Sequence, residues 1–597
     1  MSNPFCRVLA AAFSVIWLAG QGLALTLDVQ APDPLQDDIR AASLTATLAD
    51  TEAEEAPLPI DILSAAQADY GRIIALLYDQ GYFGPQISIT LDGREAASIA
   101  PIAAPRAVSN VVVTVNPGKV FTFGDLSITP KAPETEPTSG FARGETARVS
   151  VLRDATRAEI EGWRQAGHAK AAVAGQRITA RHPDGTLNAA VTLEPGPRLR
   201  LGRLTITGES AVRERRIRQI AGWPSGEVFD PDTLDKVETR LRRTGTFASA
   251  ALTEAETANP DGTLDVTATI TDQLPRRYSF GAEYGTLDGF SASALWLHRN
   301  IFGGAERLQI EGEIKGVGGD TEGVDFRLGA KLSRPATWRT DLEAFIRAEI
   351  EQRDDPNLFA RTGVLEFGTL YFASEDREYS YGVGLRRSKT RDDLGERDYT
   401  ILTFPFTFTF DRRNDPLNAT AGYYAQAAVT PFFNIDGTEN GVVTTLDLRT
   451  YRQVSDRVTL AFRGLLGSVA GPDLDVAPAD YLFFSGGSGT VRGQDYQSLG
   501  VDLTPTTTIG GRSFLGLSGE VRVQTSREAL SLVAFYDAGY IGAESFIDGS
   551  GEWHTGYGAG IRYDTGIGPI RFDMALPGSG PGDSSGLEIY IGIGQAF

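Results

Sequence analysis

The feature that most constrains the fold is a two-residue alternation of apolar with polar or small side chains, which runs through residues 277–597. The alternation is plain at residues 402–410, 515–523, 570–576 and 589–597. Successive side chains of a β-strand point to opposite faces, so the pattern predicts strands that each have one apolar face.

Two classes of β-protein show this alternation. A soluble β-sandwich places its apolar side chains inside, but a region of about 320 residues without a helical pattern is larger than a single sandwich. A transmembrane barrel instead turns the apolar face to lipid and uses strands of about 9–11 residues. At about 20 residues per strand and connection, the region predicts an all-β barrel of about 16 antiparallel strands in an outer membrane.

The N-terminus has the three-part pattern of a secretory signal. Residues 1–24 carry one positive charge, Arg7, followed by an apolar stretch at 8–18 and small residues before the expected cleavage site. The alternative is a membrane anchor, but the stretch is shorter than the roughly 20 residues of a spanning helix. Cleavage before Leu25 removes Cys6, the only cysteine, which excludes disulfides and cysteine nucleophiles from the mature chain.

Charge and motif content exclude several functions. The chain has 77 acidic and 56 basic residues and a net charge of -21, so it repels phosphate backbones and no nucleic-acid partner is expected. Its four histidines lack metal-ligand spacing, and no serine-nucleophile motif is present. We therefore expect no enzyme activity, no metal and no cofactor.

The first half contains a repeat. Residues 116–129 resemble residues 194–207, and residues 183–187 recur at 260–264. Three such units fit before residue 276, each ending a helix at a glycine, namely Gly81, Gly167 and Gly245.

Each unit is predicted to have the order β-α-α-β-β. In the third, we expect a helix at residues 210–220 and a second one that begins at Asp230 and Pro231. The predicted domains are a signal peptide at 1–24, α+β repeats at 25–117, 118–196 and 197–276, and the barrel at 277–597.

Five short motifs in the barrel region resemble those of one known family. They are RNIFGG at 299–304, DRRNDPL at 411–417, VRG at 491–493, FYDAG at 535–539 and GIGPIRFD at 566–573. Together with the repeats and the terminal Phe597, they resemble the outer-membrane assembly-factor superfamily of BamA, TamA and two-partner secretion transporters. In that family the repeats are periplasmic POTRA domains. Gln494 departs from the family, which has an aromatic residue after VRG, and Tyr496 is the expected substitute.

Three repeats before the barrel are most similar to the TamA type, since BamA usually has five and two-partner transporters two. This resemblance implies an outer-membrane factor that inserts or secretes β-barrel and autotransporter proteins. Its implied partners are those unfolded clients, a TamB-like protein anchored in the inner membrane, and outer-membrane lipids. The alternatives are a two-partner-secretion transporter of one dedicated protein and a purely structural barrel.

The resemblance also implies a buried arginine. Val491, Arg492 and Gly493 form the tip of a long extracellular loop, where a solvated arginine is the ordinary outcome. In the family the arginine meets the aspartate of the FYDAG strand, here Asp537. Strand parity agrees, because Asp537 and Glu520 lie on faces opposite to the apolar residues of their strands. We therefore expect Arg492 to pair with Asp537 or Glu520 inside the barrel.

The last candidate site is the barrel seam. Closure requires the first strand, with Ser279 and Gly281, to pair with the last strand, with Gly592, Gly594 and Phe597. Glycine weakens strand interiors, so this seam could open and offer a strand edge to a client.

Overall fold

The computed structural model describes residues 25–50, 57–285, 289–318, 323–437, 439–527, 529–565, 569–581 and 586–593. The predicted signal peptide lies outside them. None of the helices in these ranges has the length and apolar character that a membrane-spanning helix requires.

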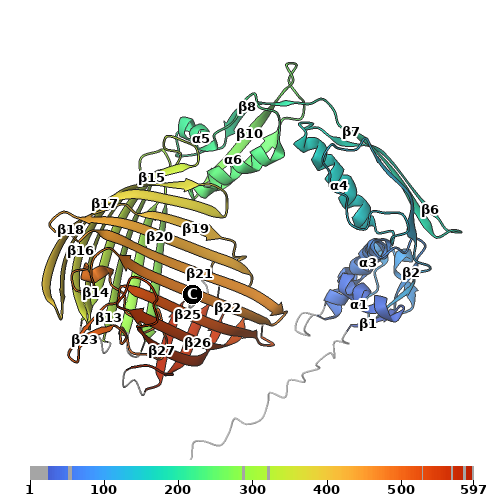
Figure 1. Cartoon of the computed structure of the whole chain (residues 1–597). Helices are drawn as coiled ribbons and strands as arrows, with labels where there is room; N and C mark the ends of the chain where they lie inside the picture. Colours follow the sequence, from blue (N-terminus) through green and yellow to red (C-terminus); the bar gives the residue numbers. More distant parts are fainter. Residues whose placement is uncertain are drawn as a thin grey trace, which may run out of the picture. The chain divides into compact units, whose positions relative to one another are not determined.

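The first repeat departs from the predicted order, because in its described residues three helices in place of two precede its remaining strands, and these helices cover a mixed sheet (Figure 1). Its strand order is β1-β4-β2-β3, with β1 parallel to β4. Ile73 and Leu77 of the long helix pack in its core. Gly81, at φ 91°, ends that helix as expected. The elements are β1 (Thr26–Gln30), α1 (Asp33–Ala42), α2 (Leu44–Ala49), α3 (Pro59–Asp79), β2 (Gln86–Leu91), β3 (Arg94–Glu95) and β4 (Asn110–Asn116).

The second repeat departs from the predicted order, because its described residues contain one helix instead of two. Prolines at 130, 133 and 137 interrupt the segment where the first helix was expected, and proline lacks the N–H that a helix interior needs. The sheet order is β5-β7-β6. The elements are β5 (Thr122–Thr129), α4 (Val149–Gln165), β6 (Ala172–Arg181) and β7 (Thr186–Glu194).

The third repeat has the predicted order, with a sheet in the order β8-β10-β9. Its first helix begins at Glu214 and not at residue 210, because Asp272 accepts hydrogen bonds from the Ser210 hydroxyl and the Ala211 N–H, at 2.7 Å each. The elements are β8 (Arg200–Thr207), α5 (Glu214–Ala221), α6 (Pro231–Arg243), β9 (Phe247–Glu254) and β10 (Thr263–Asp272). Most of this repeat belongs to one compact unit with the barrel.

The described residues after 275 form a closed antiparallel barrel, which confirms the predicted fold class. In sequence order its strands are β11 (Arg276–Gly285), β12 (Gly289–His298), β13 (Arg307–Val317), β14 (Asp325–Arg334), β15 (Leu342–Asp355), β16 (Leu358–Phe372), β17 (Arg377–Asp392), β18 (Gly395–Thr403), β19 (Phe406–Asp411), β20 (Gly422–Asn434), β21 (Gly441–Ser455), β22 (Val458–Ala470), β25 (Ser513–Gln524), β26 (Leu530–Gly542), β27 (Glu552–Tyr563), β28 (Ile570–Pro577) and β29 (Glu588–Ile593).

The alternating run at residues 402–410 is not one unbroken strand. It is divided into β18 and β19, which both pair with β17 and with β20. The break falls at Pro405, which has no N–H to donate to a neighbouring strand. Counted as one interrupted strand, β18 and β19 give 16 strands among the described residues, in agreement with the prediction.

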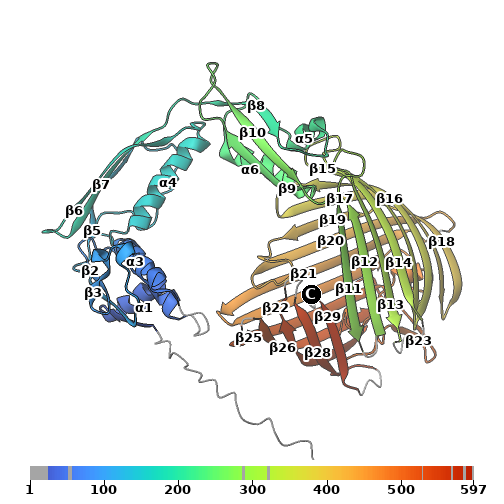
Figure 2. The same cartoon turned by 180° about the vertical axis from the view of Figure 1, so that it is seen from behind.

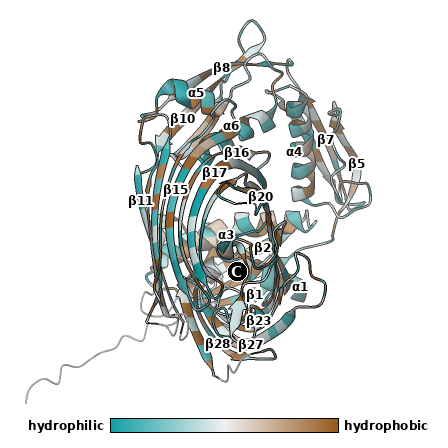
Figure 3. Ribbon diagram, turned by 60° about the vertical axis from the view of Figure 1, so that its left-hand side comes forward, coloured by the Kyte–Doolittle hydropathy of each residue, from teal (hydrophilic) through white to brown (hydrophobic). Residues whose placement is uncertain are grey.

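The predicted alternation places apolar side chains outside the barrel. Leu532 and Tyr536 of β26 are exposed, whereas Val533, Phe535 and Asp537 between and after them are buried. Figure 3 shows the resulting hydrophobic and hydrophilic bands along the barrel strands. Apolar side chains thus face lipid and charged ones face the lumen.

Candidate functional site

A long loop, residues 471–512, connects β22 to β25 and places its tip among buried lumenal side chains. The tip residue Arg492 is 2 % exposed, and Val491 beside it is fully buried. The arginine therefore lies inside the protein and is not solvated. This loop also contains the short hairpin of β23 (Val501–Thr504) and β24 (Thr507–Ile509).

The structure brings Arg492 together with both carboxylates named from the sequence. Its Nε and Nη2 donate to the two oxygens of Asp537 at 2.7 and 3.0 Å. Its Nη1 donates to Glu520 Oε1 at 2.8 Å. The guanidinium also lies 3.6 Å from the centre of the Phe535 ring, within the range of a cation–π contact.

Three further charged residues complete this site and were not named from the sequence. Asp573 on β28 accepts from Arg492 Nη1 at 3.4 Å. Arg522 pairs with Glu520 at 2.8 Å, and Arg562 pairs with Asp573 at 2.5 Å. Asp573 lies on the polar face of an alternating segment. The alternation alone could therefore have predicted that its side chain faces the lumen. We call the full set the loop-tip cluster: Arg492, Glu520, Arg522, Asp537, Arg562 and Asp573.

The loop-tip cluster is balanced in formal charge, with three arginines and three carboxylates, all nearly buried. Charge-assisted, bidentate hydrogen bonds are the arrangement that compensates the loss of hydration. Removing one member leaves an uncompensated buried charge, which typically costs about 3–5 kcal/mol. The cluster therefore holds the loop tip to β25, β26 and β28.

Two glycines let the loop approach the wall. Gly493 has φ 88°, and a Cβ there would lie 2.6 Å from the Leu576 carbonyl oxygen. A Cβ at Gly556 on β27 would overlap the Arg492 carbonyl oxygen. Only glycine at both positions permits this backbone-to-backbone contact.

Gln494 and Tyr496, which follow Gly493, contact different parts of the barrel wall. Gln494, which replaces the family's aromatic residue, is buried and donates to the Thr555 carbonyl at 2.6 Å. Tyr496 does not take the aromatic position at the tip, because its hydroxyl donates to Asp355 of β15 at 3.2 Å. The expectation that Tyr496 substitutes at the tip is therefore wrong.

The seam joins β11 to β29, as Figure 2 shows. In the described residues the two strands pair at residues 283–285 and 590–592. Gly592 lies opposite Glu283 in this pairing. Ser279 and Gly281 pair with Leu295 and Ser293 of β12. The predicted seam residues Gly594 and Phe597 lie outside the described residues.

An ion pair crosses the seam. The guanidinium of Arg571, on β28, passes over Gly592 and pairs with the Glu283 carboxylate on β11. A Cβ at Gly592 would lie 2.8 Å from Arg571 Nε. The glycine thus provides the space through which this contact is made.

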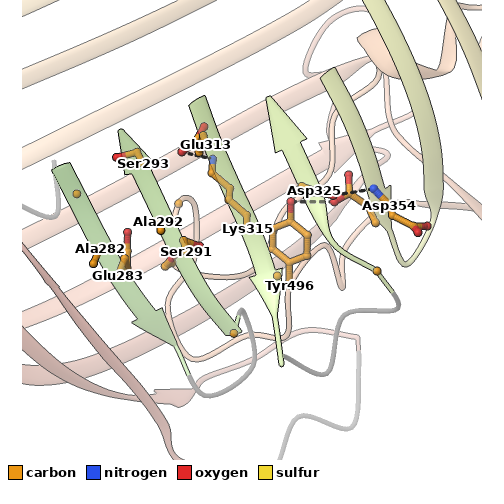
Figure 4. A pocket seen from close by; sticks show the side chains of 17 residues that line it. Ala282, Glu283, Ser291, Ala292, Ser293, Glu313, Lys315, Asp325, Asp354 and Tyr496 are labelled. Carbon is orange, nitrogen blue, oxygen red and sulfur yellow. Dashed lines mark hydrogen bonds and ion pairs between the residues drawn. The ribbon is translucent and has the colours of Figure 1, made fainter. Parts of the chain in front are cut away.

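A lumenal cavity of about 380 Å³ lies beside the seam (Figure 4). Glu283 and Ser291 line it from the first two strands, and Ser488 and Tyr496 line it from the loop. Two of its carboxylates have protein partners: Glu313 pairs with Lys315 at 3.2 Å, and Asp325 accepts from the Asp354 N–H at 2.7 Å. The described residues contain no cluster of side chains suited to a metal ion.

The motif RNIFGG forms part of the contact between the third repeat and the barrel. Arg216 of α5 is 1 % exposed and donates to the carbonyls of Gly304 and Pro335 at 3.3 and 2.5 Å. Arg240 and Arg243 of α6 both pair at 2.8 Å with Asp341, in the turn before β15. This motif therefore positions the repeat and carries no catalytic group.

Two family models match different parts of the chain. Residues 199–273 match the POTRA model, described as a surface antigen variable number repeat. Residues 300–597 match the Omp85 superfamily domain. This part of the chain is an Omp85 superfamily domain.

Solved structures share the fold over 80% of this chain. BamA from Haemophilus ducreyi, lacking POTRA domains 1–3, is 16% identical with a TM-score of 0.60, over 80% of this chain and 100% of that one. CdiB from Acinetobacter baumannii is 12% identical with a TM-score of 0.51, over 80% and 90%. CdiB from Escherichia coli is 14% identical with a TM-score of 0.50, over 80% and 91%.

An Omp85 barrel preceded by POTRA repeats defines a protein of the outer membrane whose repeats lie in the periplasm. Such proteins are insertion or secretion factors and not enzymes. The sequence predictions of localisation, fold class and non-enzymatic function are thereby confirmed. Because both BamA and CdiB share the fold, the comparisons do not distinguish an insertion factor from a two-partner transporter.

Proposed function

We propose that this Omp85 protein is a TamA-like factor that inserts β-barrel and autotransporter-type clients through its seam, without chemical catalysis. The observation that carries the proposal is the seam itself. There β29 pairs with β11, and Gly592 lies opposite Glu283. Glycine weakens a strand interior, so a glycine-containing junction is where we expect the wall to open.

An open seam would present the edge of β11 to an incoming strand. Unpaired N–H and C=O groups at such an edge form main-chain hydrogen bonds with any extended segment, whatever its side chains. This suits a factor that accepts many clients. The exposed apolar residues of β11, Phe280 and Tyr284, would already lie at the lipid-facing surface where the client is released.

The second candidate is a two-partner-secretion transporter of one dedicated protein. The fold likeness to CdiB supports it. The three periplasmic sheets among the described residues support the TamA-like proposal instead, because two-partner transporters of the resembling family usually have two repeats. In the transporter, cargo passes through the lumen and the seam stays closed.

A disulfide across the seam tests the proposal. Cysteines at Glu283 and Gly592 suit it, since a Cβ at Gly592 lies 3.5 Å from the Glu283 Cγ and the two residues are paired. We expect the oxidised Glu283→Cys/Gly592→Cys protein to insert no client into liposomes, and reductant to restore insertion.

A matched control is Gly281→Cys with Ser293→Cys, which joins β11 to β12 away from the seam. A Cβ at Gly281 lies 4.0 Å from the Ser293 Cβ, a suitable spacing for a disulfide. This crosslink should leave insertion unchanged. Normal insertion by the fully oxidised seam variant would reject lateral opening and favour transport through the lumen.

We also propose that the periplasmic sheets bind a TamB-like partner through strand edges. The edge strand β6 supports this, because it is exposed at every position except Ala180. Substituting Ile178, an exposed residue of β6, by proline places a residue without an N–H in that edge strand. Loss of co-purification with the TamB-like protein, with heat-modifiable barrel mobility retained, is the expected result; unchanged co-purification would exclude β6 as the contact.

A further inference from the structure

A second buried charge anchors the same lumenal loop at its beginning. Asp480 lies in the single turn η4 (Ala479–Tyr481), and its side chain has no solvent exposure. Its Oδ2 accepts from Arg386 Nη2 at 2.5 Å and Nε at 3.2 Å. The Ser388 hydroxyl donates to the same oxygen at 2.8 Å. Arg386 and Ser388 both belong to β17.

Backbone and ring contacts strengthen this attachment. Arg353 on β15 donates to the Asp480 carbonyl at 3.4 Å, and Arg397 on β18 donates to the Asp475 carbonyl at 2.8 Å. The Tyr481 ring lies 5.1 Å from the Arg386 guanidinium and packs against Phe432. The start of the loop is thus bound by arginines from β15, β17 and β18.

The two anchors have opposite polarity and lie on separate parts of the wall. At the loop start a loop carboxylate enters an arginine-rich wall; at the tip a loop arginine enters a carboxylate-containing cluster. Strands β18 to β22 separate β17 from β25 in the barrel order. The loop therefore crosses between two regions of the barrel and is bound on each.

The segment between the anchors has wall contacts of its own, because the Ser485 hydroxyl lies 2.8 Å from His554 Nε2 of β27 and the Phe483 ring stacks on Phe514 of β25. Residues 481–491 include Gly486 and Gly487 at φ 119° and 86°, and Gly489, whose added Cβ would meet nothing within 4 Å. Glycine-rich segments retain high conformational freedom unless both ends are held. With both ends held, the second anchor binds at a high effective concentration.

We propose that Asp480 is a positioning residue that, through Arg386, holds the loop across the lumen and closes it to ions. This inference concerns closure of the lumen and does not depend on how clients are inserted. It predicts that breaking the Asp480–Arg386 pair opens the lumen even when the loop-tip cluster is intact.

The test is single-channel conductance of the full-length protein in planar bilayers without client. Asp480→Arg and Arg386→Asp should each raise the fraction of time in a high-conductance state by about tenfold. The double exchange, Asp480→Arg with Arg386→Asp, should return it toward wild type, because opposite charges again face each other. Heat-modifiable gel mobility reports that each barrel is folded.

A control and a second variant separate the anchor from nonspecific effects. Asp475→Arg makes the same charge change in the same loop. The Asp475 side chain is exposed, and in the part of the chain that the structure describes only its backbone carbonyl contacts the wall, through Arg397. It should conduct as wild type. If the reversals do not fold, Asp480→Cys with Ser388→Cys replaces the anchor by a disulfide, which should keep the lumen closed when oxidised and open it when reduced.

Two results would overturn the inference. One is wild-type conductance in a folded Asp480→Arg barrel or, where that variant does not fold, in the reduced cysteine pair. The other is an opening in Asp475→Arg as large as in Asp480→Arg, which would show a general charge effect in place of an anchor.

Discussion

Arg571 and Glu283 form an ion pair between strands that are not neighbours, because β29 lies between them at the seam. The contact is possible because Gly592, the residue it passes over, has no side chain. Opening the seam between β11 and β29 must therefore break this pair as well as the ladder.

The first prediction follows from this pair. Arg571→Glu places two carboxylates at the seam, and we expect easier opening, seen as faster deuterium labelling of the amides of residues 283–285 of β11 in Arg571→Glu than in wild type. Restoring the pair with Glu283→Arg should slow that labelling again. Equal labelling rates in all three proteins would show that the ion pair does not restrain the seam.

The second prediction concerns the loop-tip cluster. Arg492→Ala leaves three carboxylates facing two arginines in a buried site, and we expect a loss of about 3–5 kcal/mol in the free energy of unfolding. Asp537→Asn removes one charge but keeps an acceptor for the guanidinium, so its loss should be smaller. A urea titration followed by gel mobility measures both; indistinguishable midpoints for wild type and Arg492→Ala would contradict the account.

An exchange of Arg492 with Asp537 should recover only part of the stability. The reason is that Glu520 and Asp573 also contact Arg492, and an aspartate at position 492 would face both of them. A double-mutant cycle measures the coupling. Full recovery would assign the arginine to Asp537 alone.

The third prediction uses the close backbone approach at β27. Gly556→Ala introduces a Cβ that overlaps the Arg492 carbonyl oxygen, and overpacking of this kind costs about 1–3 kcal/mol. Gly363→Ala on β16 is the matched control, since its Cβ meets nothing within 4 Å. Thermal unfolding should separate the two variants, and equal melting temperatures would exclude the overlap.

The fourth prediction is a pH dependence of the contact between the third repeat and the barrel. Burial raises the pKa of Asp341, but hydrogen bonds and charge from Arg240 and Arg243 outweigh it and hold the pKa below its ordinary 3.8. A lowered folded-state pKa contributes stability above the ordinary pKa, and this is lost as the pH falls through the folded value.

The contact should accordingly be constant from neutral pH down to about pH 4 and weaken below it. Asp341→Asn should reproduce the weakened contact at neutral pH. Hydrogen exchange of α6, corrected for intrinsic rates, measures both effects. A protein whose α6 protection falls between pH 7 and pH 5 would require a different titrating group.

Side-chain parity made much of the site predictable. Because a strand has a period of two, the positions of Glu520 and Asp537 opposite their apolar neighbours already placed them in the lumen. Asp573 had the same parity, but nothing in the sequence specified that β28 lies within reach of Arg492. Which strands face a loop depends on how it crosses the lumen, and Tyr496 shows that neighbouring loop residues reach different walls.

Pairing register and local breaks were not predictable in the same way. Pattern alone does not state which residues of β11 and β29 lie opposite each other, so the Glu283–Gly592 pair and the ion pair above it came only from the structure. The similarity of the second repeat to the third led us to predict a helix that the second repeat lacks. The prolines at 130, 133 and 137 indicate that no helix forms there.

Capture of a client strand at the seam tests the central claim most directly. A client with one cysteine in its last strand would be assembled in the presence of this protein bearing Gly592→Cys, Tyr284→Cys or, as a control in the wall, Gly363→Cys. The account predicts a mixed disulfide during assembly at positions 592 and 284, and none at 363. Adducts that form as readily at 363, or at the lumenal Ser293→Cys but not at the seam, would contradict insertion through the seam.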